Sequence, residues 1–222
     1  SSACAIAAKN WVSGARHGVR LINGSLGNLP LRKTPSPDPN NTQAFTFASE
    51  NPVYVSGNFN ANNAGFGDPH GSASVIADAV TLLSAAWDDS LSLTNPTAPS
   101  LRPAVNGNFR MAICAGKNMN FRRSLVAGTP SSDFGTDGGV QNFLRLLESW
   151  NGRTLGYRGS LVSLYYSQYA TGVFKCCQSV YQAPNRNFSF DTDFQTFALL
   201  PPGTPNFEDV VNVGFRQIFD RR

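Results

Sequence analysis

Short runs in which apolar and polar residues alternate recur along the chain, and they predict β-strands. Alternation with a period of two places one face of a strand against a core. Such runs lie at Gly18–Ile22, Phe45–Ser49, Pro52–Gly57, Phe109–Ala115 and Tyr157–Tyr166. The run Ser74–Ser84 fits both a strand and a short helix, and its period-two pattern favours a strand.

One segment, Val140–Trp150, predicts a helix. Its apolar residues recur at helical spacing, and the dipeptide Asn151-Gly152 supplies a stop signal. We expect Phe143, Leu144 and Leu147 to pack this helix against the core.

The remaining segments predict loops. Pro30–Asn41 holds four prolines, which exclude a helix or a central strand. Asp88–Asn108 is rich in Ser, Thr, Pro and Asn, and the tail from Ala183 is aromatic and rich in loop residues.

Short strands at irregular spacings between polar loops predict a mainly β fold. We expect an irregular parallel β-helix, a solenoid with long loops and one short helix, and the alternative is an irregular β-sandwich. Residues 1–41 are expected to form a strand and loop segment that continues an upstream region. Residues 42–222 are expected to form a C-terminal β domain, and the whole chain one globular unit.

Composition indicates an exported protein. Charged residues make up 14% of the 222 residues, against roughly 25% in an average soluble domain. Asn, Ser, Thr, Gly and Pro take their place, as in many secreted β proteins. The start of the chain lacks the basic and apolar regions of a signal peptide, so we expect a mature or truncated product. The expected location is extracellular or at the cell surface, after export through the periplasm.

Charge and hydropathy argue against two classes of partner. The net charge of +4 is spread over short basic pairs, none long enough to form a nucleic-acid-binding arm. No stretch reaches the roughly 18 apolar residues of a membrane helix. We therefore expect neither nucleic acid binding nor a membrane span in this chain.

Four cysteines, Cys4, Cys114, Cys176 and Cys177, are candidates for structural disulfides. An even number fits an oxidising compartment. Cys176 and Cys177 are neighbours, and on an extended segment their side chains point to opposite faces. We expect one of them to bond Cys4 and the other Cys114; which pairs with which stays open, and four reduced thiols are the alternative. The spacing fits no zinc signature, and His17 and His70 are the only histidines.

Carboxylate pairs offer the best candidates for chemistry. Asp133 with Asp137, and Asp191 with Asp193, are close enough to suggest calcium, but neither pair fits the twelve-residue calcium loop. Asp78, Asp191 and Asp193 are candidates for polysaccharide hydrolysis, although hydrogen bonding within the fold is the simpler interpretation.

Other catalytic signatures are weak. The tripeptide Asp133-Phe134-Gly135 lacks the rest of a kinase signature, and there is no G-x-S-x-G elbow. We therefore expect no catalytic, metal or cofactor site, and no enzyme.

Aromatic residues are dense toward the C-terminus. The simpler expectation is a cap that closes one end of the core, because each ring buries a large apolar area. A face that stacks on sugars or bases is the alternative. The residues concerned are Tyr165, Tyr166, Tyr169, Phe174, Tyr181, Phe188, Phe190, Phe194 and Phe197.

Four segments in order along the chain, Glu50–Asn60, Ala73–Ser90, Gly138–Gly172 and Asn185–Val210, carry a family resemblance. From about Phe45 to its end, the chain resembles the C-terminal region of large PilX-like proteins associated with type IV pilus assembly in Gram-negative bacteria. The resemblance implies a surface protein and suggests no catalytic residues.

We therefore expect an extracytoplasmic structural or interaction domain of a pilus-associated or filament-forming protein, acting in adhesion, display or assembly. Its expected partners are proteins of the pilus or filament, including copies of itself. A carbohydrate-binding or carbohydrate-active β-helix, with a glycan ligand, is the second hypothesis. A DNA-capturing minor pilin is the third.

Overall fold

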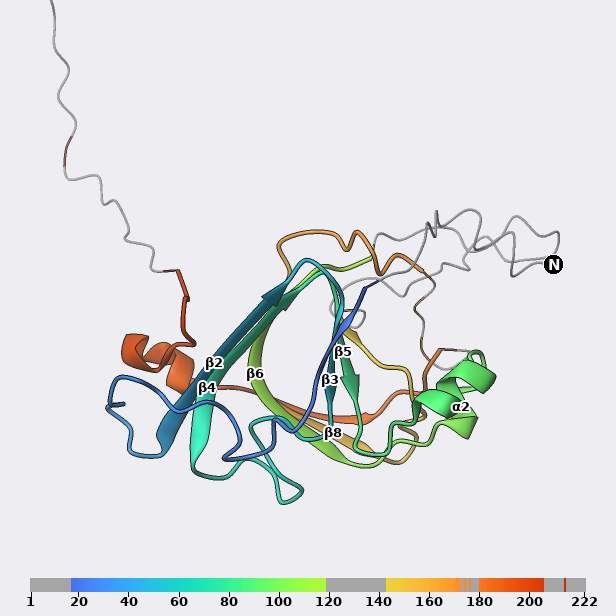
Figure 1. The fold of residues 1–222 in the computed structure, drawn as a ribbon, viewed down its shortest axis with the longest axis horizontal. Coiled ribbons are helices and arrows are strands. Elements are labelled where there is room, and N and C mark those ends of the chain that lie inside the picture. The colour runs from blue at the N-terminus through green and yellow to red at the C-terminus, as the bar shows by residue number, and fades with distance from the viewer. Residues whose placement is uncertain are drawn as a thin grey trace, which may run out of the picture.

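The computed structural model describes residues 17–118, 143–172, 174, 176, 180–205 and 214. This part of the chain is mainly β, and its strands form two parallel sheets (Figure 1). Sheet A, four-stranded, has the order β1 (Val19–Leu21), β3 (Val53–Ser56), β5 (Val80–Leu83) and β7 (Leu144–Arg145). Sheet B, five-stranded, has the order β2 (Asn41–Ser49), β4 (His70–Ala77), β6 (Gly107–Ala115), β8 (Thr154–Val162) and β9 (Asn185–Phe190).

The chain visits the two sheets in turn. From β1 to β8 each strand lies in the other sheet from the strand before it, and every strand pair is parallel. The sheets face each other across a shared core (Figure 1). The prediction of a mainly β fold is therefore confirmed. The parallel pairing agrees with the parallel strands that we expected.

Aligned apolar side chains fill the space between the sheets. In sheet A, Val53, Val80 and Leu144 occupy equivalent positions on neighbouring strands. In sheet B, Val75 and Ile113 do the same, and both are fully buried. Burying such side chains is worth about 1.5–3 kcal/mol each. The alternating pattern seen in the sequence is therefore the core face of each strand.

The strand predictions are confirmed within one to four residues at most boundaries. The segment Ser74–Ser84 is two strands, β4 and β5, joined at the buried corner Asp78-Ala79. β8 starts three residues before the predicted Tyr157–Tyr166 run and ends at Val162.

The predicted helix at Val140–Trp150 is wrong over residues 143–150; residues 140–142 lie outside the described residues. Leu144 pairs with Val80 in a parallel ladder. Beyond β7, buried residues alternate at Leu146, Glu148 and Trp150, whereas Leu147 is only half-buried. The apolar residues fit both the helical period and the strand period. Glu148 would be exposed on a helix, but here it is buried and accepts two hydrogen bonds from Ser84.

The predicted loops contain regular elements that the sequence did not suggest. Asp88–Asn108 contains the six-residue helix α2 (Asp89–Thr94), begun by Asp88 as N-cap, and the short helix η1 (Pro99–Leu101). The tail contains β9, η3 (Thr192–Gln195) and η4 (Phe197–Leu199). Within the described part of the chain, no helix is long and apolar enough to cross a membrane.

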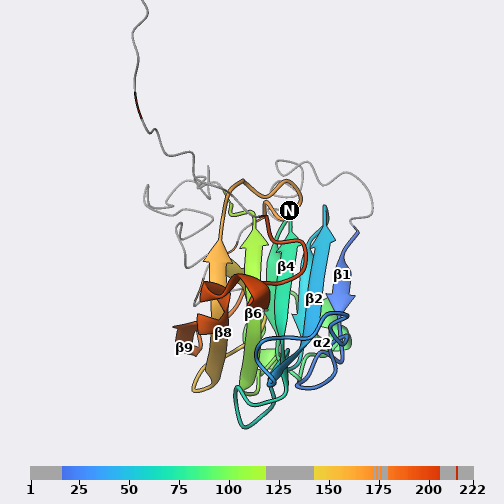
Figure 2. The same ribbon diagram turned by 90° about the vertical axis from the view of Figure 1, so that its left-hand side faces the viewer.

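The segment from Asp191 to Pro202 crosses the outer face of sheet B (Figure 2). Ser72 on β4 donates to the Leu199 carbonyl at 2.5 Å, and Thr46 on β2 donates to the Pro202 carbonyl at 2.6 Å. We call this segment the C-terminal strap. These two bonds hold the strap against β2 and β4.

Candidate functional site

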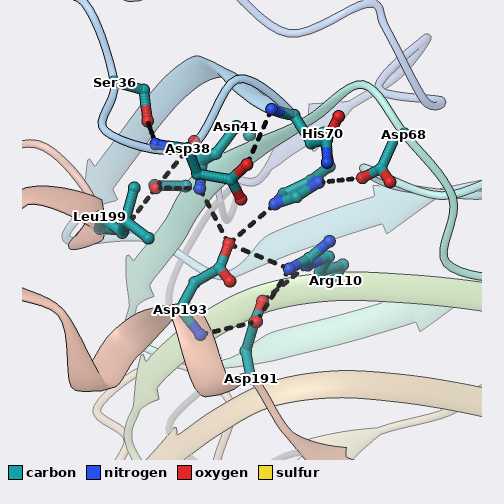
Figure 3. A network of polar contacts seen from close by, with 12 residues as sticks. Ser36, Asp38, Asn41, Asp68, His70, Arg110, Asp191, Asp193 and Leu199 are labelled. Carbon is teal, nitrogen blue, oxygen red and sulfur yellow. Dashed lines mark hydrogen bonds and ion pairs between the residues drawn. The ribbon is translucent and has the colours of Figure 1, made fainter.

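A network of polar side chains joins the C-terminal strap to sheet B (Figure 3). Its centre, which we call the anchoring network, consists of Asn41, His70, Arg110, Asp191 and Asp193. Asn41 begins β2, His70 begins β4, and Arg110 lies within β6. Because these strands are parallel and adjacent, their polar residues meet at the same end of the outer face.

Arg110 forms a two-point contact with Asp191. Its Nε and one terminal nitrogen donate to the two oxygens of Asp191 at 2.7 and 2.9 Å. The side chains of Arg110 and Asp191 are only 6% and 3% exposed. Such two-point pairs are directional as well as strong. The same guanidinium reaches Asp193 at 3.1 Å.

His70 lies between two carboxylates. Its Nδ1 is 2.6 Å from an oxygen of Asp68, and its Nε2 is 2.8 Å from Oδ2 of Asp193. Asn41 also donates to Oδ2 of Asp193 at 3.0 Å. Burial opposes the ionisation of Asp193, but the hydrogen bonds from His70 and Asn41 and the charge of Arg110 outweigh it. The pKa of Asp193 is therefore lowered.

Asp38, His70 and Asp193 offer donor atoms that all lie within 4.8 Å of one another. A cation there would compete with Arg110 and Asn41, which already bond the same oxygen of Asp193. A guanidinium at 3.1 Å also repels a divalent ion. The donor set therefore fits a structural anchor for the strap better than a metal centre.

Asp78 anchors a second segment, at the other end of sheet B. Its carboxylate accepts hydrogen bonds from the Ser167 hydroxyl at 2.6 Å and from the backbone amides of Gln168, Tyr169 and Ala170 at 2.5–3.1 Å. Asp78 itself is 5% exposed. Gly116 allows the two backbone segments to come close, because a Cβ there would lie 2.6 Å from both the backbone oxygen of Asp78 and the backbone nitrogen of Ser167.

A pocket of about 410 Å³ opens beside this anchor. We call it the tyrosine pocket, because Tyr165, Tyr166 and Tyr169 of the loop after β8 line it. These side chains are 39%, 55% and 41% exposed. The remaining lining residues are Ser49, Glu50, Asp78 and Gln168.

Tyr165 is held rigidly although its ring is partly exposed. Its hydroxyl donates to the Ala77 carbonyl at 2.7 Å and approaches the Cys114 carbonyl at 3.3 Å. Burial of the hydroxyl, with contributions from Cys114 and Asp78, raises the pKa of Tyr165 to about 12. The ring therefore stays neutral and fixed at the pocket wall.

The predicted aromatic cluster divides into two groups. Phe174 and Tyr181 are buried and stack at 5.0 Å between ring centroids, as a core cap requires. The others are partly or largely exposed; Phe190 and Phe197, for example, are 52% and 67% exposed. The expected core cap therefore describes Phe174 and Tyr181, and for the exposed rings the face that stacks on sugars or bases stays a prediction.

The cysteine prediction needs a correction at Cys114, which is free. Its side chain lies on the outer face of β6, in register with the exposed residues Ile76 and Val162. Cys176 instead packs against the core and is disulfide-bonded. The other two cysteines, Cys4 and Cys177, lie outside the described residues. The expected bridge from Cys114 is therefore wrong, because its thiol faces away from the core.

Of the candidate carboxylates, Asp78, Asp191 and Asp193 do not converge on one pocket. Asp191 and Asp193 belong to the anchoring network, and Asp78 belongs to the tyrosine pocket. Asp133 and Asp137 lie outside the described residues. The hydrogen-bonding interpretation of Asp78, Asp191 and Asp193 therefore agrees with their contacts.

Several participants were not identified from the sequence: Arg110, Asn41 and His70 of the anchoring network, and Glu50 and Gln168 of the tyrosine pocket. An arginine inside the apolar run Phe109–Ala115 is a usable signal, because a cation in a buried strand needs a counter-ion. Glu50 follows a strand end and carries no such signal.

Comparisons with protein-family models, curated proteins and solved structures find no match for this chain.

Proposed function

We propose that this chain is an extracytoplasmic structural and interaction domain of a pilus-associated or filament-forming surface protein. One observation carries the proposal. The buried carboxylates among the described residues, Asp78, Glu148 and Asp191, all accept hydrogen bonds from protein groups. They stabilise loops and the strap, and this favours binding or assembly over turnover.

The finer fold that we propose is a parallel β-helix. Each passage through sheet A and then sheet B corresponds to one coil, and parallel pairing between coils is typical of solenoids, whereas β-sandwiches are mostly antiparallel. A solenoid suits a filament, because coils stack end to end. All six residues of β9, at the edge of sheet B, are exposed. An edge of this kind can pair with a further strand.

The extracytoplasmic location is supported by the low charge content and by the disulfide at Cys176. Because Cys114 is free, at most one intramolecular disulfide can form among the four cysteines. Intact mass before and after reduction should therefore differ by about two hydrogens. A protein isolated from its own cells with no mass change on reduction would contradict the location.

The direct test is surface labelling of the parent protein in the bacterium that encodes it. Antibody against this domain should label intact cells, and mechanical shearing should release the antigen together with surface filaments. A cytoplasmic protein serves as the control that intact cells exclude antibody. Labelling that appears only after permeabilisation would overturn the proposal.

The carbohydrate hypothesis divides into binding and cleavage. The tyrosine pocket favours binding, since it presents exposed rings beside polar side chains. Cleavage would need a pair of free carboxylates, and of the two at this pocket, Glu50 is exposed but Asp78 is bound by four donors. Polysaccharide cleavage that Asp78→Ala abolishes while the fold stays intact would favour an enzyme instead.

A further inference from the structure

We propose that the tyrosine pocket binds a neutral oligosaccharide. The inference deepens the proposed function and rests on it, because a surface interaction domain needs a ligand and this pocket supplies a site. At about 410 Å³ the pocket lies in the range of small-molecule sites, roughly 300–1,000 Å³. It has room for about one or two sugar rings.

The pocket is organised before any ligand arrives. The carboxylate of Asp78 holds the backbone from Gln168 to Ala170, and the loop also pairs with the strand end through Lys117 N to Tyr165 O at 3.2 Å and Ser167 N to Lys117 O at 3.0 Å. These bonds fix the segment that carries the tyrosines. A ligand therefore meets a formed surface, and little conformational entropy is lost on binding.

The exposed rings fit the apolar faces of sugar rings. A pyranose has apolar C–H faces and a rim of hydroxyl groups, so it needs an aromatic surface with polar groups beside it. Tyrosine offers a large apolar ring face. Tyr166 supplies the most exposed ring, while Glu50 and Gln168 are exposed at the same pocket and can bond hydroxyl groups.

Charge disfavours the other ligand classes. An anionic ligand, including a nucleic acid, would meet the carboxylate of Glu50. A cationic ligand would compete for the Tyr166 ring with Lys117, whose Nζ already lies 5.7 Å from the centroid of that ring. A ligand without net charge avoids both penalties.

The experiment uses the whole chain and a panel of neutral gluco-, galacto-, manno- and N-acetylglucosamine oligosaccharides on a glycan array. The best ligand is then titrated by NMR. Tyr166→Ala should weaken its binding at least tenfold. The matched control, Phe197→Ala, removes a 67% exposed ring from the C-terminal strap and should leave the affinity unchanged.

Two further arms separate the ligand classes. Glu50→Gln keeps a hydrogen-bonding group and removes the charge, so neutral glycan binding should change by less than about threefold, whereas binding of a cation would be lost. Single- and double-stranded DNA should not compete. Thermal melts of each variant establish that it is folded.

Three results would overturn the inference: no binding of any neutral oligosaccharide at millimolar concentration, equal binding by Tyr166→Ala, or salt-dependent DNA binding that Tyr166→Ala removes. None of them changes the surface-labelling result. Failure of the ligand and failure of the proposed location can therefore be told apart.

Discussion

Two polar regions lie at opposite ends of sheet B. In the anchoring network, Asp193 accepts hydrogen bonds from Asn41 and Arg110 and contacts His70. Arg110 also donates two hydrogen bonds to Asp191. In the tyrosine pocket, polar groups fall into two sets. Asp78 is bound by four donors, whereas Glu50 and Gln168 lie exposed beside tyrosine rings.

The comparison teaches how to separate structural polar clusters from binding surfaces. A carboxylate whose oxygens are occupied by protein donors has little capacity left for a ligand. Clustering of Asp and His alone would favour the anchoring network as the functional site. Hydrogen-bond occupancy favours the tyrosine pocket, because that pocket combines a fixed frame with exposed groups.

The largest expected effect comes from removing Arg110. Arg110→Met should destabilise the protein by about 3–5 kcal/mol, because it leaves the buried carboxylate of Asp191 without its counter-ion. Urea denaturation measures the loss. Arg158→Met is the matched control: Arg158 pairs in register with Arg110 and contacts the Phe66 ring at 4.7 Å. It should cost about 1 kcal/mol or less. Equal losses would contradict the role given to the anchoring network.

Removing Asp78 should cost somewhat less, about 2–4 kcal/mol, because several amide donors lose their acceptor. Asp78→Ala tests this by thermal and urea unfolding. Ser167→Ala removes one of the four donors and should cost about 1 kcal/mol. If Asp78→Ala were as stable as the wild type, the frame of the tyrosine pocket would not depend on this carboxylate.

Asp193 should make the anchoring network sensitive to acid. Its pKa is lowered in the folded protein, so the unfolded chain binds this proton more readily. The stabilisation is present above the ordinary Asp value of about 3.9 and is lost as the pH falls through the lowered pKa. Asp193→Asn should therefore be less stable than the wild type at pH 7 and closer to it near pH 3. A difference that stays constant from pH 7 to pH 3 would refute the linkage.

The smallest effect on stability is expected at Tyr166. Tyr166→Ala removes a ring that is 55% exposed, so the loss should stay below about 1 kcal/mol. The measurement is the midpoint of urea unfolding, compared with that of Asp78→Ala. A loss as large as that of Asp78→Ala would mean that Tyr166 supports the fold, and the contrast between frame and exposed surface would fail.

Much of the fold could be predicted because strand periodicity is local. The alternation in Phe109–Ala115 and Pro52–Gly57 predicted β6 and β3 without knowledge of their neighbours. The same reasoning failed at Val140–Trp150. Its apolar residues suit a helix in isolation, but pairing of Leu144 with Val80 and the contact of Glu148 with Ser84 stabilise an extended chain. Partners more than 60 residues away decided that segment.

By itself, the sequence determined that the chain is mainly β, that its strands are short and apolar on one face, and that Asp78, Asp191 and Asp193 were the carboxylates to examine. Only the tertiary structure decided which role each residue plays. Arg110 meets Asp191 across 81 residues, and Asp78 meets Gln168 across 90. Side-chain alternation follows from the geometry of a single strand, whereas the occupancy of a carboxylate depends on which distant segments the parallel sheets bring against it.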